Sequence, residues 1–257
     1  MRISLVLVLG FVSLGYMGCN ARHDVVQSQE APESERIAPL EIASSDTGKV
    51  PDFDNAWSEK VQAVTAGLAT EIDCHFPVDD KKLEELPTNI HLEVLLLEQG
   101  ELTRTGMERV ARISGLRRLG LRDCLFGDEE ALLVAAMPNL AVLNVPDSQM
   151  TGLGLETLSQ SKSLTSLRLG TDRPIEHLGS ALRGFQDLRH LHLIGFNVDR
   201  DVLEILVELP ELQSLYLDDA HLSDDEIDWL VMAGGHLHIH LDQMHPDRKK
   251  PPVSGAR

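Results

Sequence analysis

Leucine recurs along the middle of the chain in a fixed pattern. The motif Leu-x-x-Leu-x-Leu returns every 24 residues without an insertion, with its copies beginning at Leu92, Leu116, Leu140, Leu164, Leu188, Leu212 and, in degenerate form, His236. Alternation of apolar residues within each copy is typical of a β-strand with one buried face. The pattern therefore predicts a series of short strands in equivalent environments.

The rest of each interval carries apolar residues three to four positions apart. This spacing is that of an amphipathic helix, and it is clearest over Asp128 to Met137 and Asp224 to Met232. Both segments begin with acidic residues, which suit the free N–H groups and the dipole at a helix N-terminus. Much of the formal net charge of −18 is therefore explained by helix starts.

The alternation of strand and helix resembles the leucine-rich repeat family, in particular its short bacterial and ribonuclease-inhibitor-like members, over about residues 66–243. The resemblance implies an α/β fold: a right-handed leucine-rich-repeat solenoid with a parallel concave sheet and helices on the convex side. We expect an N-terminal cap over residues 54–91 and the repeats over residues 92–244.

Two repeats depart from the pattern. Pro174 stands where the other repeats have an apolar residue, which predicts a locally different turn between strand and helix. His236 replaces a core leucine, and Gly234-Gly235 break the preceding helix. Both features are expected of a terminal repeat that must face water.

Cys124 falls at the position where members of the family often carry asparagine. Cysteine-containing repeats of the family use this place, so the resemblance implies a buried, structural thiol. Cys74 lies two turns away. Neighbouring strands are about 4.8 Å apart, so two turns exceed the reach of a disulfide, and we expect none between Cys74 and Cys124.

The N-terminus has the features of an export signal. Arg2 precedes an uncharged apolar run over residues 3–17, which is too short to span a membrane comfortably. Gly18-Cys19 resembles the lipobox of bacterial lipoproteins, which implies a signal peptide over residues 1–18 and lipidation of Cys19. Asn20 would, by the same resemblance, permit outer-membrane delivery. We expect an exported lipoprotein facing the periplasm or the cell surface, with plain secretion as the alternative.

Two segments lack a sustained apolar period. Residues 19–53 are rich in acids, Pro, Ser and Gln, which predicts a disordered tether. Residues 245–257 are rich in Pro and basic residues, which predicts a disordered tail.

Composition narrows the classes of function. The chain has 257 residues with 41 acidic against 23 basic ones, which argues against nucleic acid as a ligand. It contains no Gly-rich phosphate loop, no GxSxG and no HExxH motif. We expect a non-catalytic monomer without a cofactor, which touches a membrane only through its N-terminal lipid.

The outward-facing strand residues would form the concave surface, where two groups of side chains stand out. Arginine forks can bind carboxylate or phosphate, and the basic group consists of Arg118, Arg122 and Arg168. Cross-strand pairing would instead neutralise such residues, as Glu98 could do for Arg122, and Glu93 for Arg117. The second group consists of His190, His192, Tyr216, Asp218, His238 and His240.

Histidines two residues apart on one strand share a face and could chelate a transition metal. The two histidine pairs lie two strands apart, about 9.6 Å, so they cannot share one ion, and we predict no specific metal site. Tyr216 is the only aromatic residue predicted on the concave surface, which makes it the expected anchor for a partner.

These features predict a non-catalytic scaffold of the bacterial cell envelope that binds a protein or another envelope macromolecule through its concave sheet. Two alternatives stay open. One is a structural envelope component without a specific ligand, and the other is a weak metal-binding periplasmic protein that uses the concave histidines.

Overall fold

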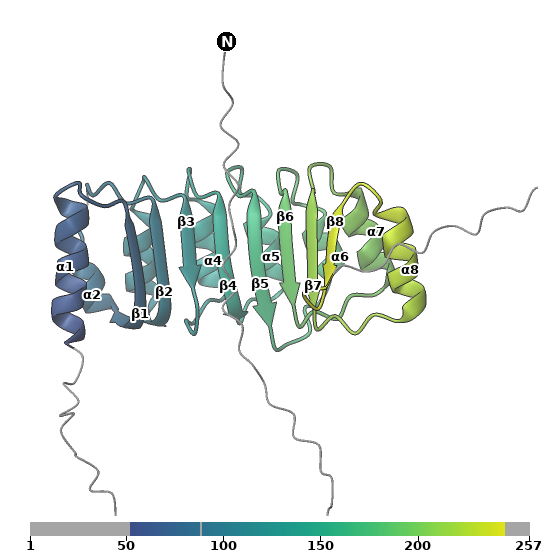
Figure 1. Ribbon diagram of the computed structural model, residues 1–257, viewed down its shortest axis with the longest axis horizontal. Coiled ribbons are helices and arrows are strands. Elements are labelled where there is room, and N and C mark those ends of the chain that lie inside the picture. The colour runs from purple at the N-terminus through teal and green to yellow at the C-terminus, as the bar shows by residue number, and fades with distance from the viewer. Residues whose placement is uncertain (1–51, 88, 245–257) are drawn as a thin grey trace, which may run out of the picture. The chain divides into compact units, whose positions relative to one another are not determined.

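Each sequence repeat folds into one strand and one helix, and the strands lie side by side in one sheet (Figure 1). The computed structural model describes residues 52–87 and 89–244. Its strands are β1 (Glu71–Asp79), β2 (Val94–Glu101), β3 (Arg118–Leu121), β4 (Val142–Ser148), β5 (Ser166–Thr171), β6 (His190–Ile194), β7 (Ser214–Asp218) and β8 (His238–Leu241). Its helices are α1 (Phe53–Thr65), α2 (Asp80–Glu84), α3 (Arg104–Ala111), α4 (Asp128–Ala135), α5 (Gly152–Leu158), α6 (Leu178–Leu182), α7 (Arg200–Glu208) and α8 (Asp224–Ala233).

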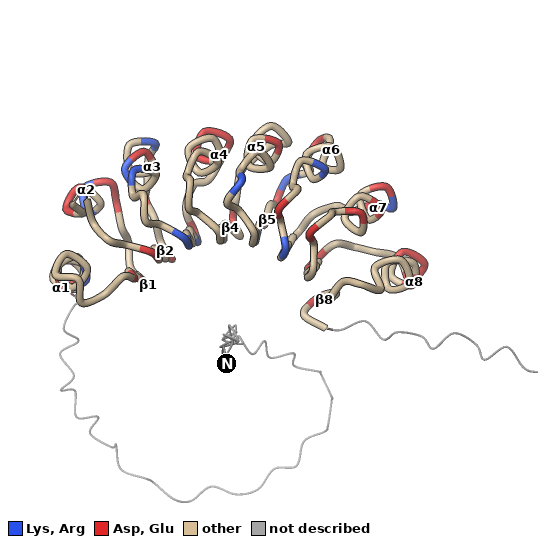
Figure 2. Tube along the Cα trace, turned by 90° about the horizontal axis from the view of Figure 1, so that it is seen from above, with Lys and Arg blue, Asp and Glu red and all other residues tan. Residues whose placement is uncertain are grey.

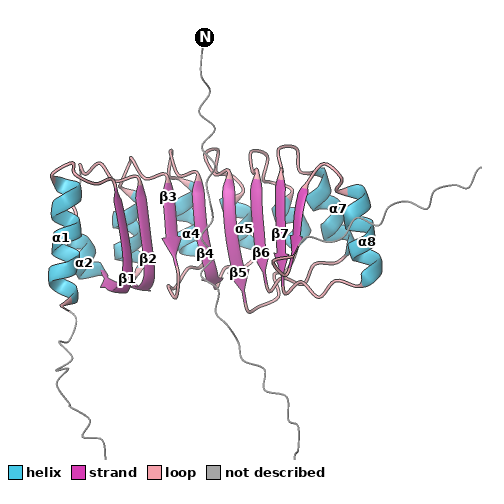
Figure 3. Ribbon diagram, viewed as in Figure 1, coloured by secondary structure: helices cyan, strands magenta, loops and turns pink. Residues whose placement is uncertain are grey.

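The strands run parallel and follow sequence order across an eight-stranded sheet. Figure 2 shows the strands along the inner side of a curved array and the helices along its outer side, and Figure 3 separates the two layers by colour. The fold is a leucine-rich-repeat solenoid. This confirms the predicted fold class.

The 24-residue interval sets the register between strands. Leu95 pairs with Leu119, Leu119 with Leu143, and Leu143 with Leu167, and none of these side chains is more than 1% exposed. Because successive residues of a strand point to opposite faces, the residues on either side of these leucines point to the concave surface.

Helix starts recur with the same interval as the strands. The N-cap residues of α3, α4, α5, α7 and α8 are Thr103, Gly127, Thr151, Asp199 and Ser223. All of these except Gly127 accept a hydrogen bond from a first-turn N–H through the side chain, which stabilises the helix start. The predicted acidic first turns are present in α4 and α8.

The repeat that contains Pro174 has a different helix start, as the sequence predicts. Ile175 occupies the N-cap position of the 24-residue series there, and its side chain has no hydrogen-bond acceptor. Helix α6 begins only at Leu178 and is five residues long. His177 precedes it in the left-handed region with φ of 58° and makes no side-chain cap.

Strand β1, inside the segment expected to be a cap, extends the sheet by one strand that the leucine pattern does not predict. Its pairing with β2 joins Glu71 to Val94, an offset of 23 residues rather than 24. Ile72 and Cys74 fill its core positions, and both are fully buried. Helix α1 lies at this end of the solenoid and contributes the fully buried Trp57 to the core.

Two helix starts are tied to the preceding helix by an aspartate. Asp128, in the first turn of α4, accepts hydrogen bonds from Thr151 N (2.8 Å) and Thr151 Oγ1 (2.7 Å) at the start of α5. A methyl group on Gly154 would overlap Asp128 Oδ1, so glycine leaves room for this acceptor. We call this arrangement an Asp–Thr–Gly clamp. A second clamp joins α2 and α3 through Asp80, Thr103 and Gly106.

The C-terminal end of the repeats carries polar residues at core positions, as predicted. Helix α8 ends at Ala233, immediately before Gly234-Gly235. His236 is exposed, whereas the next residue, Leu237, is 2% exposed. The terminal repeat therefore gives up one apolar position to water.

Cys74 and Cys124 are both buried free thiols. Cys124 is 4% exposed, and its Sγ lies 3.1 Å from the carbonyl oxygen of Arg122, to which it donates. Burial raises the pKa of each thiol to about 11. The prediction of a structural Cys124 is confirmed.

Several predicted features lie outside the described residues: the signal peptide, Cys19, most of the tether over residues 19–53 and the tail over residues 245–257. The end of the predicted tether belongs to the start of α1, where Asp52 Oδ1 accepts a hydrogen bond from Asn55 N. Within residues 52–87 and 89–244, no helix has the length and apolar character needed to cross a bilayer.

Candidate functional site

The concave surface is built from the outward-facing residues of the strands. The register of β3 to β8 aligns these residues in rows across the sheet, because each pairs with the residue 24 positions later. The central row in this region consists of Gly120, Asn144, Arg168, His192, Tyr216 and His240. Polar and aromatic side chains are thus neighbours on successive strands.

Four side chains of this surface form a hydrogen-bonded series that we call the polar chain: Asn144, Arg168, His192 and Asp218. Arg168 donates from Nη1 to Asn144 Oδ1 and from Nε to His192 Nδ1, each at 3.3 Å. His192 Nε2 lies 2.9 Å from Asp218 Oδ2. The polar chain therefore links β4, β5, β6 and β7.

The contacts of the polar chain define the protonation state of His192. Its Nδ1 accepts from Arg168, so the proton resides on Nε2 and is donated to Asp218. Burial lowers the pKa of His192, and this effect outweighs the opposing effect of its hydrogen bond to Asp218. The side chains of His192 and Asp218 are only 22% and 14% exposed. The imidazole is therefore neutral and held in one orientation.

Tyr216 lies within a group of rings that we call the ring cluster: His192, Tyr216, His238 and His240. The tyrosine ring stacks on His240 at 4.4 Å with an interplanar angle of 11°. It meets His192 at 5.4 Å and 37°, and His238 edge-on at 6.3 Å and 65°. The structure thus places the predicted anchor between three imidazoles on β6 and β8.

The histidines divide differently from the predicted pairs. His192 belongs to both the polar chain and the ring cluster, whereas no ring contact in the described part of the chain includes His190. His238 Nε2 and His240 Nε2 lie 2.8 Å apart. No group of three His, Cys, Asp or Glu residues among those described is placed to hold a metal ion.

Two arginines of the predicted basic group stay outside the polar chain. Arg118 Nε is buried, and no acceptor in the described part of the chain reaches it. Arg122 Nη1 lies 4.0 Å from Glu98 Oε1, but Glu98 Oε2 is much closer, at 2.7 Å, to His75 Nδ1. The expected Arg122 pair is therefore long, and Glu98 bonds mainly to a residue of β1.

The prediction that Glu93 pairs with Arg117 across the strands is wrong. Glu93 Oε1 lies 3.4 Å from His91 Nε2, and across the described ranges no ion pair joins Glu93 to Arg117. His91 is two residues before Glu93, so both side chains point to the same side of an extended backbone. This local contact needs less ordering of long side chains than a cross-strand pair.

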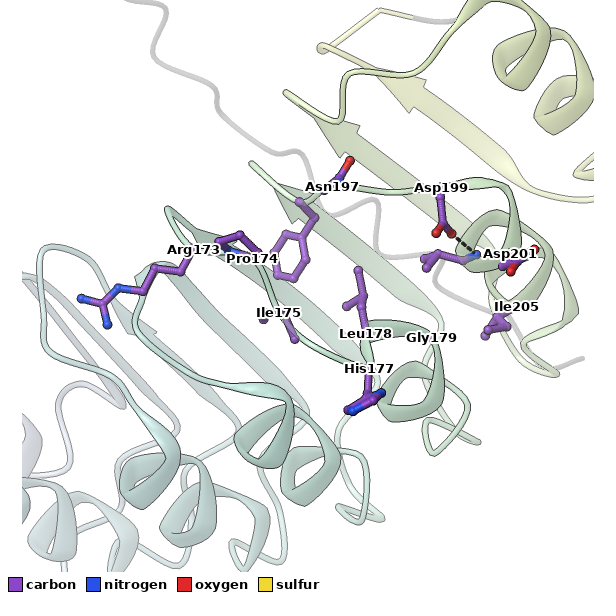
Figure 4. Close-up of a pocket in the computed structure, with 12 residues that line it drawn as sticks. Arg173, Pro174, Ile175, His177, Leu178, Gly179, Asn197, Asp199, Asp201 and Ile205 are labelled. Atoms are coloured by element: carbon purple, nitrogen blue, oxygen red, sulfur yellow. Dashed lines mark hydrogen bonds between the residues drawn. The ribbon is translucent and has the colours of Figure 1, made fainter.

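A hollow of about 340 Å³ lies between the turn after β5 and the start of α7 (Figure 4). Its lining includes Ile175, Leu178 and Ile205. Figure 4 shows Arg173 extended away from the other labelled side chains, and the dashed hydrogen bond is the cap of α7, from Val202 N to Asp199 Oδ1 at 2.9 Å. The hollow accompanies the late start of α6, so we attribute it to the irregular turn.

Sequence reasoning did not single out Asn144 or His75. Asn144 accepts a hydrogen bond from the Arg168 guanidinium at one end of the polar chain, and His75 binds Glu98. Asn144 could have been predicted, because its position 24 residues before Arg168 predicts adjacency on neighbouring strands. His75 could not have been predicted, because it lies on β1, where the 24-residue interval fails.

No family model matches the chain, and no curated protein does. Among solved structures, it is similar to an internalin from Listeria monocytogenes, with 24% identity and a TM-score of 0.44 over 64% of this chain and 45% of that one. It is also similar to actin-binding site 2 of leiomodin-1, with 14% identity and a TM-score of 0.33 over 73% of this chain and 90% of that one. The chain thus spans less than half of the internalin, and neither likeness bears on its partner or activity.

Proposed function

We propose that the chain is a protein-binding scaffold of the bacterial cell envelope, and that the concave surface around Tyr216 holds its partner. The observation that supports this proposal is the ring cluster, in which Tyr216 is stacked on His240 at 4.4 Å and flanked by two further imidazoles. A side chain that is already ordered loses less conformational entropy when a partner binds.

Tyr216 has the properties of an interface anchor. It is partly exposed between His192 and His240 in the central row of the sheet, and it offers apolar area together with one hydroxyl. The polar chain beside it holds His192 and Asp218 in fixed orientations. A partner would therefore meet a surface whose main contact groups need little rearrangement.

The experiment is capture of partners from solubilised envelopes on the immobilised full chain. Tyr216→Ala removes the ring and should abolish capture of the specific partner, whereas Tyr216→Phe keeps the stacking and should retain most of it. His221→Ala is the matched control, because His221 is exposed and lies in the turn after β7. Circular dichroism should show the same folded structure for all four proteins at the temperature of the capture. Equal capture by wild type and Tyr216→Ala would leave a structural envelope component as the better description.

We further propose export and anchoring through a lipid on Cys19, with the chain facing the periplasm or the cell surface as a monomer. The support is the sequence from Met1 to Cys19. Wild type should incorporate a clickable fatty-acid label and sediment with membranes, whereas Cys19→Ser should do neither. Cys124→Ser should keep the label. Labelling of Cys19→Ser would contradict lipidation at this residue.

Weak metal binding has one observation in its favour, the 2.8 Å approach of His238 Nε2 to His240 Nε2. Two imidazoles on one strand would fill only half of a tetrahedral site. Addition of zinc should therefore leave the thermal midpoint unchanged. A rise with zinc that His238→Ala and His240→Ala together remove would instead identify a metal-handling protein.

A further inference from the structure

The strands β3 to β5 carry outward-facing arginines, and the only acidic residue within these three strands is Asp147, near the end of β4. Arg118 and Arg122 point outward from β3 and its end, and Arg168 points outward from β5. Apart from Asp147, the other outward positions of these strands hold Gly, Val, Asn, Pro or Ser. The chain as a whole has a formal net charge of −18. This region is therefore locally positive on a protein that is negatively charged overall.

The three guanidinium groups have few anionic partners. Arg118 Nε is buried without an acceptor in the described part of the chain. Both hydrogen-bond acceptors of Arg168, on Asn144 and on neutral His192, are uncharged and lie at 3.3 Å. Arg122 reaches Glu98 only at 4.0 Å. Buried donors without partners carry a desolvation cost, which a bound acceptor would remove.

The positive charge of Arg122 repels that of Arg168. Burial lowers the pKa of the Arg168 guanidinium, and the charge of Arg122 lowers it further. Asp218 and Asp147 oppose these effects at longer range, and among the described residues neither comes within 4.0 Å of Arg168. An anion placed between Arg122 and Arg168 would relieve both the repulsion and the lack of charged acceptors.

We propose that Arg118, Arg122 and Arg168 form a binding site for the carboxylates of an acidic protein segment. The inference rests on the proposed function and names the chemistry of the partner. A planar guanidinium fork matches a carboxylate and can bind it through two parallel hydrogen bonds. The overall charge of −18 repels long polyanions, so a short acidic stretch within a protein fits the site better than nucleic acid does.

The positions of the arginines favour more than one carboxylate. Arg122 follows β3 and lies two strands across and two residues along from Arg168, which separates their backbones by about 12 Å. Acidic residues two apart in an extended segment share a face and are separated by about 7 Å, a difference that arginine side chains can bridge. The site therefore suits a segment in which acidic residues alternate with others.

The test is a titration of a fluorescent, end-capped peptide of alternating glutamate and serine, (Glu-Ser)₄, with the full-length protein, followed by fluorescence polarisation. The neutral peptide (Gln-Ser)₄ is the matched probe. We expect saturable binding of the acidic peptide only, and at least a tenfold weaker affinity for the double variant Arg118→Gln, Arg168→Gln, since a hydrogen bond to a charged group contributes about 1.5–3 kcal/mol.

The control for net charge is the double variant Arg112→Gln, Arg183→Gln, which loses the same charge from exposed C-cap positions of α3 and α6. It should bind as wild type does. If the concave double variant fails to fold by circular dichroism, Arg122→Gln replaces it, because the Arg122 side chain is 51% exposed and packs little. It should lower the affinity severalfold.

Three results would overturn the carboxylate assignment. They are equal affinity of wild type and the concave variants, no saturable binding at about 1 mM protein, and displacement of the peptide by inorganic phosphate at concentrations where acetate has no effect. The same experiments distinguish failure of the carboxylate site from failure of the proposed function. Capture that depends on Tyr216 without binding of (Glu-Ser)₄ refutes the carboxylate site alone, and peptide binding with capture that ignores Tyr216 refutes the anchor alone.

Discussion

The Asp–Thr–Gly clamp predicts that Gly154→Ala destabilises the protein, although alanine is the better helix former. Gly154 lies in the first turn of α5, where alanine would by propensity alone stabilise by about 0.8–1 kcal/mol. The added methyl group must displace Asp128 Oδ1, which accepts from Thr151 N at 2.8 Å. This moves the whole carboxylate, whose Oδ2 accepts from Thr151 Oγ1 at 2.7 Å. The sign of the effect therefore decides between propensity and the clamp.

The magnitude follows from the two hydrogen bonds. Each contributes about 0.5–1.5 kcal/mol net, so their loss costs about 2 kcal/mol, and subtraction of the propensity gain leaves a destabilisation of about 1 kcal/mol. For a chain of this size the thermal midpoint should fall by about 2–4 °C. Circular dichroism during thermal and urea unfolding measures both quantities.

A double-mutant cycle isolates the contact with Asp128. In the background of Asp128→Ala the acceptor is gone, so Gly154→Ala should become neutral or stabilising. Gly235→Ala is a control for glycine replacement, because the nearest atom to its added methyl would be Met232 O at an ordinary 3.7 Å. Stabilisation by Gly154→Ala in the wild-type background would refute the clamp. An equal loss in both backgrounds would place the clash elsewhere in the turn.

Three further predictions concern other parts of the molecule. Burial lowers the pKa of His192 below its unfolded value of about 6.5. The contribution of neutral His192 to stability is therefore present above that pH and is lost as the pH falls through the folded pKa. His192→Gln should flatten the fall in thermal midpoint between pH 7 and pH 5. Cys74 and Cys124, with pKa values of about 11, should resist iodoacetamide at pH 8 in the folded protein and react after unfolding, as peptide mass spectrometry would show. Leu143→Ala, at a fully buried position, should cost about 2–5 kcal/mol in urea unfolding, and a cost below about 1 kcal/mol would contradict the assigned core.

The register of the concave surface could be predicted from the sequence because the interval never varies between β2 and β8. A constant 24 residues places Arg168 beside His192 and His192 beside Tyr216 before any coordinates are known. The interval fails only at β1, where the offset is 23 residues and Cys74 replaces a leucine, and that strand was missed for this reason.

Side-chain partners could not be predicted from the register alone. The positions of the residues on adjacent strands predict pairs of arginine with glutamate. Instead, Glu98 binds His75 and Glu93 binds His91, because these histidines are nearer. Arg168 bonds to two uncharged groups instead. The choice among partners depends on rotamers and burial, which the spacing of residues does not specify.

The late, uncapped start of α6 divides the solenoid at a particular place. In a linear array each turn contacts only its neighbours, so a weak turn interrupts the spread of cooperativity along the chain. Under heat or mechanical load, β6 to β8 would then detach before the rest, and amide hydrogens there would exchange faster. The ring cluster lies on the detaching side and the three arginines on the other. A partner that contacts both groups would bridge the irregular repeat, so its binding should raise the temperature or the force at which β6 to β8 detach.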